Sequence, residues 1–336
     1  MDSSIIFSQF DNTNTRKVNK VKDFLTSVKL ELSPDIEVYV SAKEENKMIA
    51  CGGLSGNILK CIAISPEKRG EGLFLSLMTQ LINAANDRSR KKLFVYSTPN
   101  NISYFEKCGF LMIEKCDNKI ILMENSKNLE QYKNDLSKLK KEGEVIGSIV
   151  MNANPFTLGH LYLVEEAAKK SEHLHLFVVK EDSSEFSFID RLFLIKKGLE
   201  HLKNITIHEG SDYIISKVTF PTYFIKDKGS INELHAKLDL SIFRNKIAPQ
   251  LNITHRFIGT EPYCSVTNNY NKNMKQILEE KNLISKSIEV VEIKRIEYEN
   301  KAISASRVRA LLKEKDYDEL SKIVPPTTFD FLVKKT

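Results

Sequence analysis

Residues 147–160, Gly-Ser-Ile-Val-Met-Asn-Ala-Asn-Pro-Phe-Thr-Leu-Gly-His, carry the clearest structural signal in this chain of 336 residues. The apolar run at residues 149–151 predicts a short buried strand, which the following Asn-Pro pair ends. Apolar residues at helical spacing predict a helix over residues 158–170. This order places Thr157 and His160 at a helix N-terminus, where free backbone N–H groups and the helix dipole attract phosphate.

The polar residues of this turn each have a chemical use. Gly159 lets a phosphate approach the backbone closely, and Thr157 offers a hydroxyl to a phosphate oxygen. His160 can donate a hydrogen bond to the charge that builds on an α-phosphate during in-line displacement. Taken alone, Thr-x-Gly-His is equally compatible with a structural strand-turn-helix corner that holds a hydrogen-bonded histidine.

A second motif lies near the C-terminus. Residues 303–309, Ile-Ser-Ala-Ser-Arg-Val-Arg, follow a predicted strand over residues 287–293 and run into a helical pattern. Singly, Ser304 equally suits a helix N-cap, and Arg307 or Arg309 equally suits a solvated surface position. Together with Thr-x-Gly-His, this motif resembles the paired signatures of the HxGH nucleotidyltransferase superfamily.

Six segments spread over the chain resemble the [citrate (pro-3S)-lyase] ligase family; they are residues 152–160, 178–182, 188–191, 220–226, 259–263 and 303–309. The resemblance implies that ATP, with Mg²⁺ on its phosphates, activates acetate as acetyl-adenylate. It further implies that the acetyl group passes to the thiol prosthetic group, derived from dephospho-coenzyme A, of the citrate lyase acyl carrier subunit. AMP and pyrophosphate are the implied products.

The resemblance also implies roles for single residues. Those expected to act in catalysis are His160, Thr157, Arg309 and Lys226. Those expected to contact ATP are Asn152, Asn154, Pro155, Phe156, Thr157, Gly159, His160, Arg191, Gly259, Glu261, Ser304, Ser306 and Arg309. A solvated or salt-bridged side chain is the alternative for Arg191. A plain loop is the alternative for residues 259–263, although they follow a predicted strand whose carboxyl end is where open parallel sheets bind ligands.

A glycine-rich turn marks the N-terminal part of the chain. Residues 65–73, Ser-Pro-Glu-Lys-Arg-Gly-Glu-Gly-Leu, follow a predicted strand and open a helix with one apolar face. This order resembles the Gcn5-related N-acetyltransferase (GNAT) fold and its pyrophosphate loop. We expect Arg69, Gly70 and Gly72 to contact the prosthetic group. Glu67 stands at the first loop position, where its charge would repel a pyrophosphate, so either Arg69 and the amides compensate or acyl-coenzyme-A binding has weakened.

These observations predict an α/β protein of two domains. Residues 1–125 are expected to form a GNAT-like α+β domain, and residues 126–144 a polar connector helix that ends at Gly143. Residues 145–336 are expected to form a Rossmann-like domain in which ATP lies across the carboxyl edge of a five-stranded parallel sheet.

Composition limits the partners. The apolar fraction is 41%, and no apolar run approaches a membrane span. Five cysteines without a Cys-x-x-Cys pair predict reduced thiols in the cytoplasm and no zinc site. The net charge of +6 is scattered, which suits nucleotides and an acidic carrier better than duplex DNA. We therefore expect neither nucleic acid nor membrane as a partner.

His173 and His175 alternate on a predicted strand, and we interpret them as strand-edge residues and not as metal ligands.

Two other functions use the same motifs. One is an adenylyltransferase for a phosphate-bearing substrate, such as phosphopantetheine or nicotinamide mononucleotide. The N-terminal domain and residues 261–270, which such an enzyme does not need, argue against it. The other is a non-catalytic nucleotide sensor, against which the intact His160 and Arg309 argue.

Overall fold

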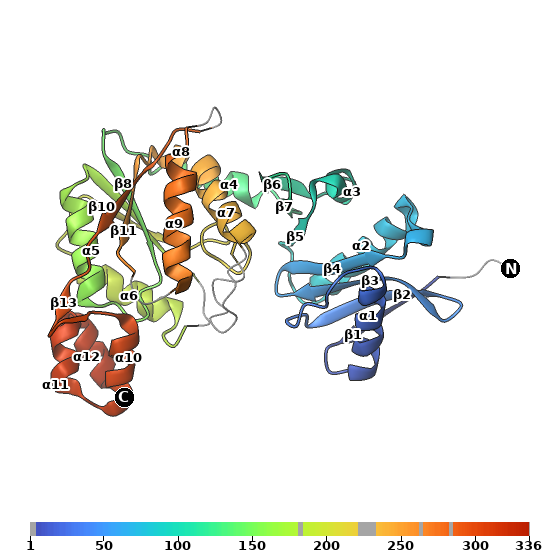
Figure 1. The fold of residues 1–336 in the computed structure, drawn as a ribbon, viewed down its shortest axis with the longest axis horizontal. Helices are drawn as coiled ribbons and strands as arrows, with labels where there is room; N and C mark the ends of the chain where they lie inside the picture. The colour runs from blue at the N-terminus through green and yellow to red at the C-terminus, as the bar shows by residue number, and fades with distance from the viewer. Residues whose placement is uncertain (1–4, 181–183, 221–232, 262–264, 282–284, 336) are drawn as a thin grey trace. The chain divides into compact units, whose positions relative to one another are not determined.

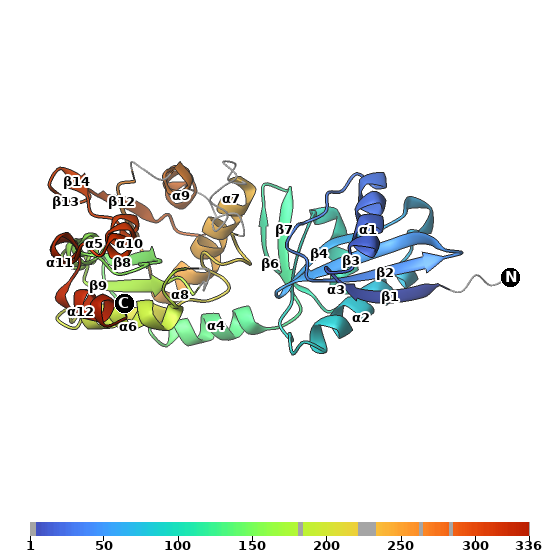
Figure 2. The same ribbon diagram turned by 90° about the horizontal axis from the view of Figure 1, so that it is seen from below.

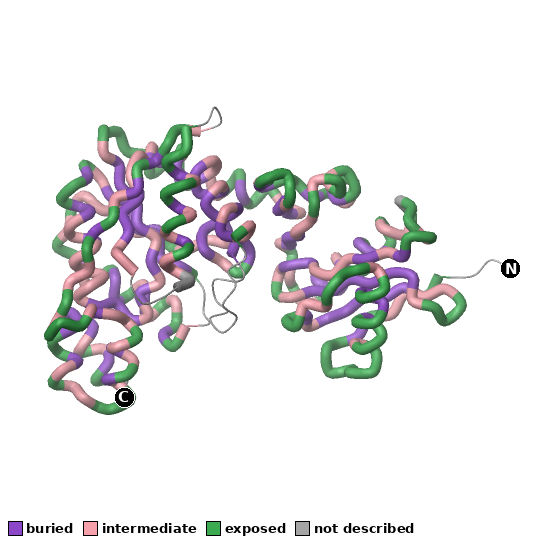
Figure 3. The backbone as a smooth tube through the Cα atoms, in the orientation of Figure 1, coloured by how far each residue is buried: buried purple, intermediate pink, exposed green. Residues whose placement is uncertain are grey.

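The computed structural model describes residues 5–180, 184–220, 233–261, 265–281 and 285–335. Its internal contacts divide the chain into two units, Met1–Glu130 and Gln131–Thr336 (Figure 1). Each unit has its own sheet and its own hydrophobic core, and each is described by itself. Figure 3 shows the buried residues concentrated along the strands of each sheet.

The described part of the N-terminal unit forms a seven-stranded sheet in the order β1-β2-β3-β4-β5-β7-β6. Its strands are β1 (Ile6–Asp11), β2 (Val38–Glu44), β3 (Lys47–Ser55), β4 (Ile58–Ile64), β5 (Phe94–Ser97), β6 (Leu111–Cys116) and β7 (Ile120–Glu124). Neighbouring strands are antiparallel except for β4 and β5, which pair in parallel through Ile58 and Leu59. Past Leu59, β4 leaves β5 and continues beside β3 toward the glycine-rich turn.

Helices cover both faces of this sheet. They are α1 (Thr15–Ser27), α2 (Glu71–Asn86) and α3 (Ile102–Glu106), with short 3₁₀ turns η1 (Pro66–Lys68) and η2 (Pro99–Asn101). Figure 2 shows α1 and α2 on opposite faces. Leu25 of α1 belongs to the same core cluster as Tyr39, whereas Leu81 of α2 belongs to that of Val40. Because adjacent strand residues point to opposite faces, β2 supplies both clusters.

The described part of the C-terminal unit forms a five-stranded sheet in the order β10-β9-β8-β11-β12. Its strands are β8 (Ile146–Met151), β9 (His173–Val178), β10 (Ile205–Glu209), β11 (His255–Gly259) and β12 (Glu289–Ile293). All neighbouring pairs are parallel, so the predicted fold class is confirmed. The carboxyl ends of the strands therefore meet at one edge.

Two layers of helix enclose this sheet. Ile149 and Phe257 face α5 (Leu158–Lys169) and α6 (Phe188–Gly198), which supply Val164 and Leu194 to the same cluster. The opposite face packs on α7 (Glu233–Ile242), the π-helical η5 (Phe243–Ile247), α8 (Ala248–Leu251) and α9 (Ser265–Glu279). A small hairpin of β13 (Glu297–Tyr298) and β14 (Lys301–Ala302) precedes α10 (Ala305–Glu314), α11 (Tyr317–Ile323) and α12 (Pro326–Lys335). These last helices gather into one cluster (Figure 1).

The connector differs from its prediction at the C-terminal end. Helix α4 (Asn128–Ser137) stops six residues before Gly143. Its last turn tightens, because the N–H of Leu139 donates to the carbonyl of Leu136 at 2.8 Å and the Ser137 hydroxyl donates to that of Asn134 at 2.8 Å. None of the helices in the described residues is long and apolar enough to cross a membrane.

The histidines of β9 also differ from the prediction. Strand β9 lies between β10 and β8, so His175 is fully buried inside the sheet and is not an edge residue. Its Nδ1 lies 2.9 Å from Nε2 of His208 on β10. Burial, with the neighbouring histidines as a smaller cause, lowers the pKa of His175 to about 3 and that of His208 to about 4. Within the described residues, no group of three or more His, Cys, Asp or Glu side chains could hold a metal ion.

Candidate active site

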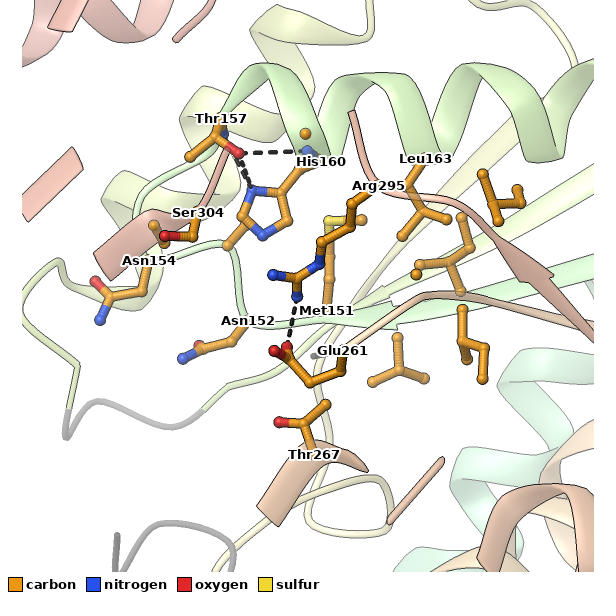
Figure 4. Close-up of a pocket in the computed structure, with 18 of the residues that line it drawn as sticks. Met151, Asn152, Asn154, Thr157, His160, Leu163, Glu261, Thr267, Arg295 and Ser304 are labelled. Carbon is orange, nitrogen blue, oxygen red and sulfur yellow. Dashed lines mark hydrogen bonds and ion pairs between the residues drawn. The ribbon is translucent and has the colours of Figure 1, made fainter. Parts of the chain in front are cut away.

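A pocket of about 1260 Å³ opens at the carboxyl edge of the C-terminal sheet (Figure 4). Its wall is formed by the ends of β8 and β11, the first turns of α5 and α10, and the inner side of α9. The two sequence motifs meet here, since both His160 and Ser304 line it. The position agrees with the rule that open parallel sheets bind ligands beyond their carboxyl ends.

Helix α5 begins with a capping box that uses a histidine. Thr157 is the N-cap, and its hydroxyl oxygen accepts from the backbone N–H of His160 at 3.3 Å. In return, Nδ1 of the His160 ring accepts from the backbone N–H of Thr157 at 3.1 Å. Because Nδ1 is an acceptor, the neutral ring carries its proton on Nε2. Figure 4 shows the edge of the ring away from Thr157 facing Asn152 and Arg295.

The surroundings of His160 keep it uncharged. Burial, together with the positive charge of Arg295, lowers the pKa of His160 to about 4. The ring also stacks on Phe156, with 5.9 Å between centroids. At neutral pH it is therefore a neutral hydrogen-bond donor through Nε2, which can stabilise negative charge without bringing a cation that must first be desolvated.

Gly159 joins the two motifs. A Cβ at this position would lie 3.0 Å from the carbonyl oxygen of Ile303, which is tighter than nearly all real contacts of this kind. Glycine therefore lets the first turn of α5 approach the segment that leads into α10. This close packing is a structural reason for the glycine, beside the phosphate approach expected from the sequence.

The N-terminal part of α10 supplies a cation. Ser304 caps the helix by accepting from the N–H of Arg307 at 3.1 Å. Arg309 lines the pocket; it donates to the carbonyl of Asn154 at 2.5 Å and to the Ser306 hydroxyl at 3.1 Å. Its Nε lies 3.5 Å from a Glu185 carboxylate oxygen.

Arg307 points elsewhere, because it pairs with Glu319 and donates to the carbonyl of Tyr298 at 3.1 Å. It holds the C-terminal helices to the hairpin before them. Of the two arginines in this motif, Arg309, which was expected to contact ATP, is the one that lines the pocket.

Three of the residues expected to contact ATP do not line the pocket: Pro155, Phe156 and Arg191. Phe156 is fully buried in the core. Arg191 is also fully buried, and its Nη1 donates to the carbonyls of Asn152 and Val179, both at 2.8 Å. Its donors are thus used on backbone carbonyls at the ends of β8 and β9, so Arg191 is neither a surface residue nor placed to reach a phosphate.

The remaining expected residues divide into three groups. Asn152, Asn154, Gly259 and Glu261 line the pocket as predicted. Lys226 lies outside the described residues. Gly70 and Gly72 belong to the N-terminal unit, where a Cβ on either would meet nothing within 4 Å, so the start of α2 is open to a ligand.

Glu67, which follows the first residue of η1, is exposed beside this turn and pairs with Lys47 at 3.1 Å. The sequence analysis considered Arg69 and the amides as compensation for its charge. In the structure the cation that pairs with it is Lys47.

The sequence analysis missed Arg295. This residue follows β12, lines the pocket, and pairs through Nη2 with Glu261 at 2.5 Å (Figure 4). The signal was present, since Arg295 is the second residue after the strand predicted over residues 287–293, at the same sheet edge as Gly259. Thr267 of α9, labelled in the same view, was missed as well.

Comparison with known proteins identifies the family. Residues 146–332 match the family described as citrate lyase ligase C-terminal domain, and residues 8–110 match the acetyltransferase (GNAT) family. The chain is 45% identical over 328 residues to [Citrate [pro-3S]-lyase] ligase of Escherichia coli (strain K12), which covers 97% of this chain and 93% of that protein. This chain belongs to the citrate lyase ligase family. The ligase of Haemophilus influenzae (strain ATCC 51907 / DSM 11121 / KW20 / Rd) is 44% identical over 97% of this chain and 98% of its own length.

Adenylyltransferases match only distantly. The phosphopantetheine adenylyltransferase of Staphylococcus saprophyticus subsp. saprophyticus (strain ATCC 15305 / DSM 20229 / NCIMB 8711 / NCTC 7292 / S-41) is 24% identical over 112 residues, covering 32% of this chain and 69% of that protein. The resemblance to a citrate lyase ligase is thus confirmed over nearly the whole chain, whereas the adenylyltransferase match is confined to a third of it.

Proposed function

We propose that this chain joins ATP and acetate to acetyl-adenylate and then acetylates the thiol prosthetic group of the citrate lyase acyl carrier subunit. AMP and pyrophosphate are released. The observation that carries the proposal is the neutral His160 donor, held by Thr157 and facing a pocket that Arg309 also lines, in a member of the citrate lyase ligase family.

The ATP phosphates would rest at the start of α5, where the backbone near Gly159 offers N–H groups. Ser306 and Arg309 would hold the phosphate oxygens from the start of α10. To bind a phosphate oxygen, Arg309 must give up its contact with the Asn154 carbonyl or with Glu185. The phosphates of ATP carry a larger negative charge than either of these groups. Asn152 and Asn154 lie at the end of β8 beside this position.

In the first step, an acetate oxygen attacks the α-phosphorus while the bond to the bridging oxygen breaks and pyrophosphate leaves. Negative charge on the α-phosphoryl oxygens grows, and Nε2–H of His160 would stabilise it. Mg²⁺ would bind together with ATP, held by its phosphates, and would keep several of its water ligands. Lys226 would add a further positive charge, as the family resemblance implies.

In the second step, the thiolate of the carrier takes the acetyl group and AMP leaves. We propose that Arg69, Gly70 and Gly72 hold the arm of the prosthetic group, because the start of α2 presents open backbone N–H groups. We also propose a cytoplasmic location, which the free thiols of Cys51, Cys61, Cys108 and Cys116 support.

Pyrophosphate release tests the proposal. With ATP and Mg²⁺ present, release should depend on added acetate, and the carrier thiol should become acetylated. Release without acetate that depends instead on phosphopantetheine would identify an adenylyltransferase. ATP binding without any turnover would identify a sensor.

The role of the N-terminal unit is tested separately. A chain of residues 131–336, which forms a compact unit, should exchange labelled pyrophosphate into ATP in the presence of acetate but acetylate the carrier slowly. Equal rates of carrier acetylation by this chain and the whole protein would contradict the proposed cradle at Arg69.

A further inference from the structure

The pocket carries positive charge on both sides of His160. On one side lies the start of α10, with Ser304 and Arg309. On the other lies Arg295, which follows β12 and is paired with Glu261. Figure 4 shows Ser304 and Asn154 on one side of the His160 ring, and Arg295 with Glu261 on the other. The proposed function uses only the first of these two sides.

The geometry of displacement at phosphorus gives the second side a role. The attacking oxygen and the leaving oxygen lie in line on opposite sides of the phosphorus atom. If His160 lies at the α-phosphate and the pyrophosphate is held near Ser306 and Arg309, the attacking acid must come from the side of Arg295. We propose that Arg295 binds the carboxylate of the acid substrate, an inference that rests on the proposed function.

The space beside Arg295 limits the size of this acid. A Cβ on Gly259 would lie 4.0 Å from both Cγ and Nε of Arg295, and 4.0 Å from Cδ2 of Leu163. Gly259 thus leaves a gap about the size of a methyl group between the guanidinium of Arg295 and the apolar side chain of Leu163. These three residues all line the pocket. A short aliphatic carboxylic acid matches this chemistry, with its carboxylate on Arg295 and its methyl group toward Leu163.

Glu261 positions the guanidinium. Its side chain is only 8% exposed, and it holds Nη2 of Arg295 at 2.5 Å. The backbone N–H of Arg295 is fixed as well, since it donates to the Thr260 hydroxyl at 3.1 Å. Among the described residues, Nε and Nη1 of Arg295 make no hydrogen bond. The N–H groups of Nη1 can therefore donate to one carboxylate oxygen and leave the other to attack.

The step is balanced without a proton transfer. The free oxygen of the acid anion forms a bond to the α-phosphorus, and the bond from that phosphorus to the bridging oxygen breaks. Pyrophosphate leaves with the electron pair of that bond. Because Glu261 already shares the charge of Arg295, the bound carboxylate keeps enough electron density to act as a nucleophile.

Two substitutions of Arg295 in the whole chain test this assignment. Arg295→Gln should raise the KM for acetate about 10- to 100-fold, the worth of a charge-assisted hydrogen bond, while the KM for ATP changes less than about threefold. Arg295→Lys should recover part of the loss because it keeps the charge. Lys275→Gln is the matched control, since this cation on α9 pairs with Glu292 at 3.7 Å and does not line the pocket. It should leave both KM values unchanged.

Gly259→Ala tests the gap independently. Its new Cβ would make ordinary contacts at 4.0 Å, so the fold should tolerate it. The methyl group would occupy the proposed acid site, and the KM for acetate should rise about tenfold with little change for ATP. An unchanged acetate KM in Arg295→Gln, or equal rises for ATP and acetate, would overturn the assignment and leave the proposed function standing. If the unsubstituted chain released no pyrophosphate in response to acetate, both proposals would be overturned.

Discussion

Lowering the pH from 8 to 5 should destabilise the C-terminal unit through two buried histidines. Nδ1 of His175 and Nε2 of His208 lie 2.9 Å apart, a hydrogen bond that needs one donor and one acceptor. If the accepting ring gains a proton, two N–H donors face each other; if the donating ring gains one, a second N–H is buried inside the unit. Burial is the main cause of the low pKa values, about 3 for His175 and about 4 for His208.

The sign and size of the effect follow from these values. In the unfolded chain both rings titrate near 6.5. Between that pH and about 4 the unfolded chain therefore binds more protons than the folded one, and stability falls as the pH falls. At pH 5, about 1.5 units below the unfolded pKa, each ring should cost about 2 kcal/mol of unfolding free energy. Two rings would cost about 4 kcal/mol, a large share of the 5–15 kcal/mol typical of a domain.

Urea unfolding at pH 8 and pH 5, followed by circular dichroism, measures this loss. His208→Gln removes one titrating ring, and its amide can still hydrogen-bond to His175, so about 2 kcal/mol of the pH-dependent loss should disappear. The contribution of His160, whose pKa is lowered as well, should remain. His201→Gln is the control, because His201 is exposed and pairs with Glu165 at 2.8 Å at the surface. A His208→Gln variant with the same pH dependence as the unsubstituted chain would refute the reasoning. So would an equally large effect of His201→Gln.

Two further predictions concern the pocket. His160→Gln should lower kcat by about 10²- to 10³-fold with little change in ATP affinity, because the lost donor acts on charge that develops during the reaction. ATP titration measures the affinity, and pyrophosphate release measures the turnover. Equal losses of both would make His160 a ground-state ligand only. Arg309→Lys should slow acetyl-adenylate formation about tenfold or more because the planar fork is lost, whereas Arg307→Lys, away from the pocket, should lower the unfolding midpoint and leave kcat unchanged. The opposite pattern would exchange the roles of the two arginines.

The parts of the fold that local sequence determines were predictable. Periodicity located β8 and α5 to within a few residues, since each depends on its own apolar pattern. The parallel order of the sheet followed from strands that alternate with helices. Both motifs were expected at helix N-termini, and Thr157 and Ser304 are indeed N-caps. These features need no knowledge of distant contacts.

The differences come from contacts between residues far apart in the chain. An arginine near a phosphate-binding motif suggests that it contacts the ligand. Arg191 instead donates to the carbonyls of Asn152 and Val179, a role that depends on how the folded chain packs. Arg295 was missed for the related reason that its place depends on the pairing of β12 with β11. Gly143 was a reasonable helix end, but a tight turn at Leu139 ended α4 first.

The histidine capping box couples the start of helix α5 to the tautomer of His160. In the usual box a glutamate or glutamine returns to the N-cap amide; here His160 does so, and the same bond keeps the proton on Nε2. Fraying of the first turn of α5 would free Nδ1 and let the ring take the other tautomer, which offers the pocket an acceptor where a donor is needed. Amide hydrogen exchange at Thr157 should therefore report the fraction of molecules in which His160 carries its proton on Nε2. Local order at one backbone position then measures how much of the protein has its catalytic donor in place.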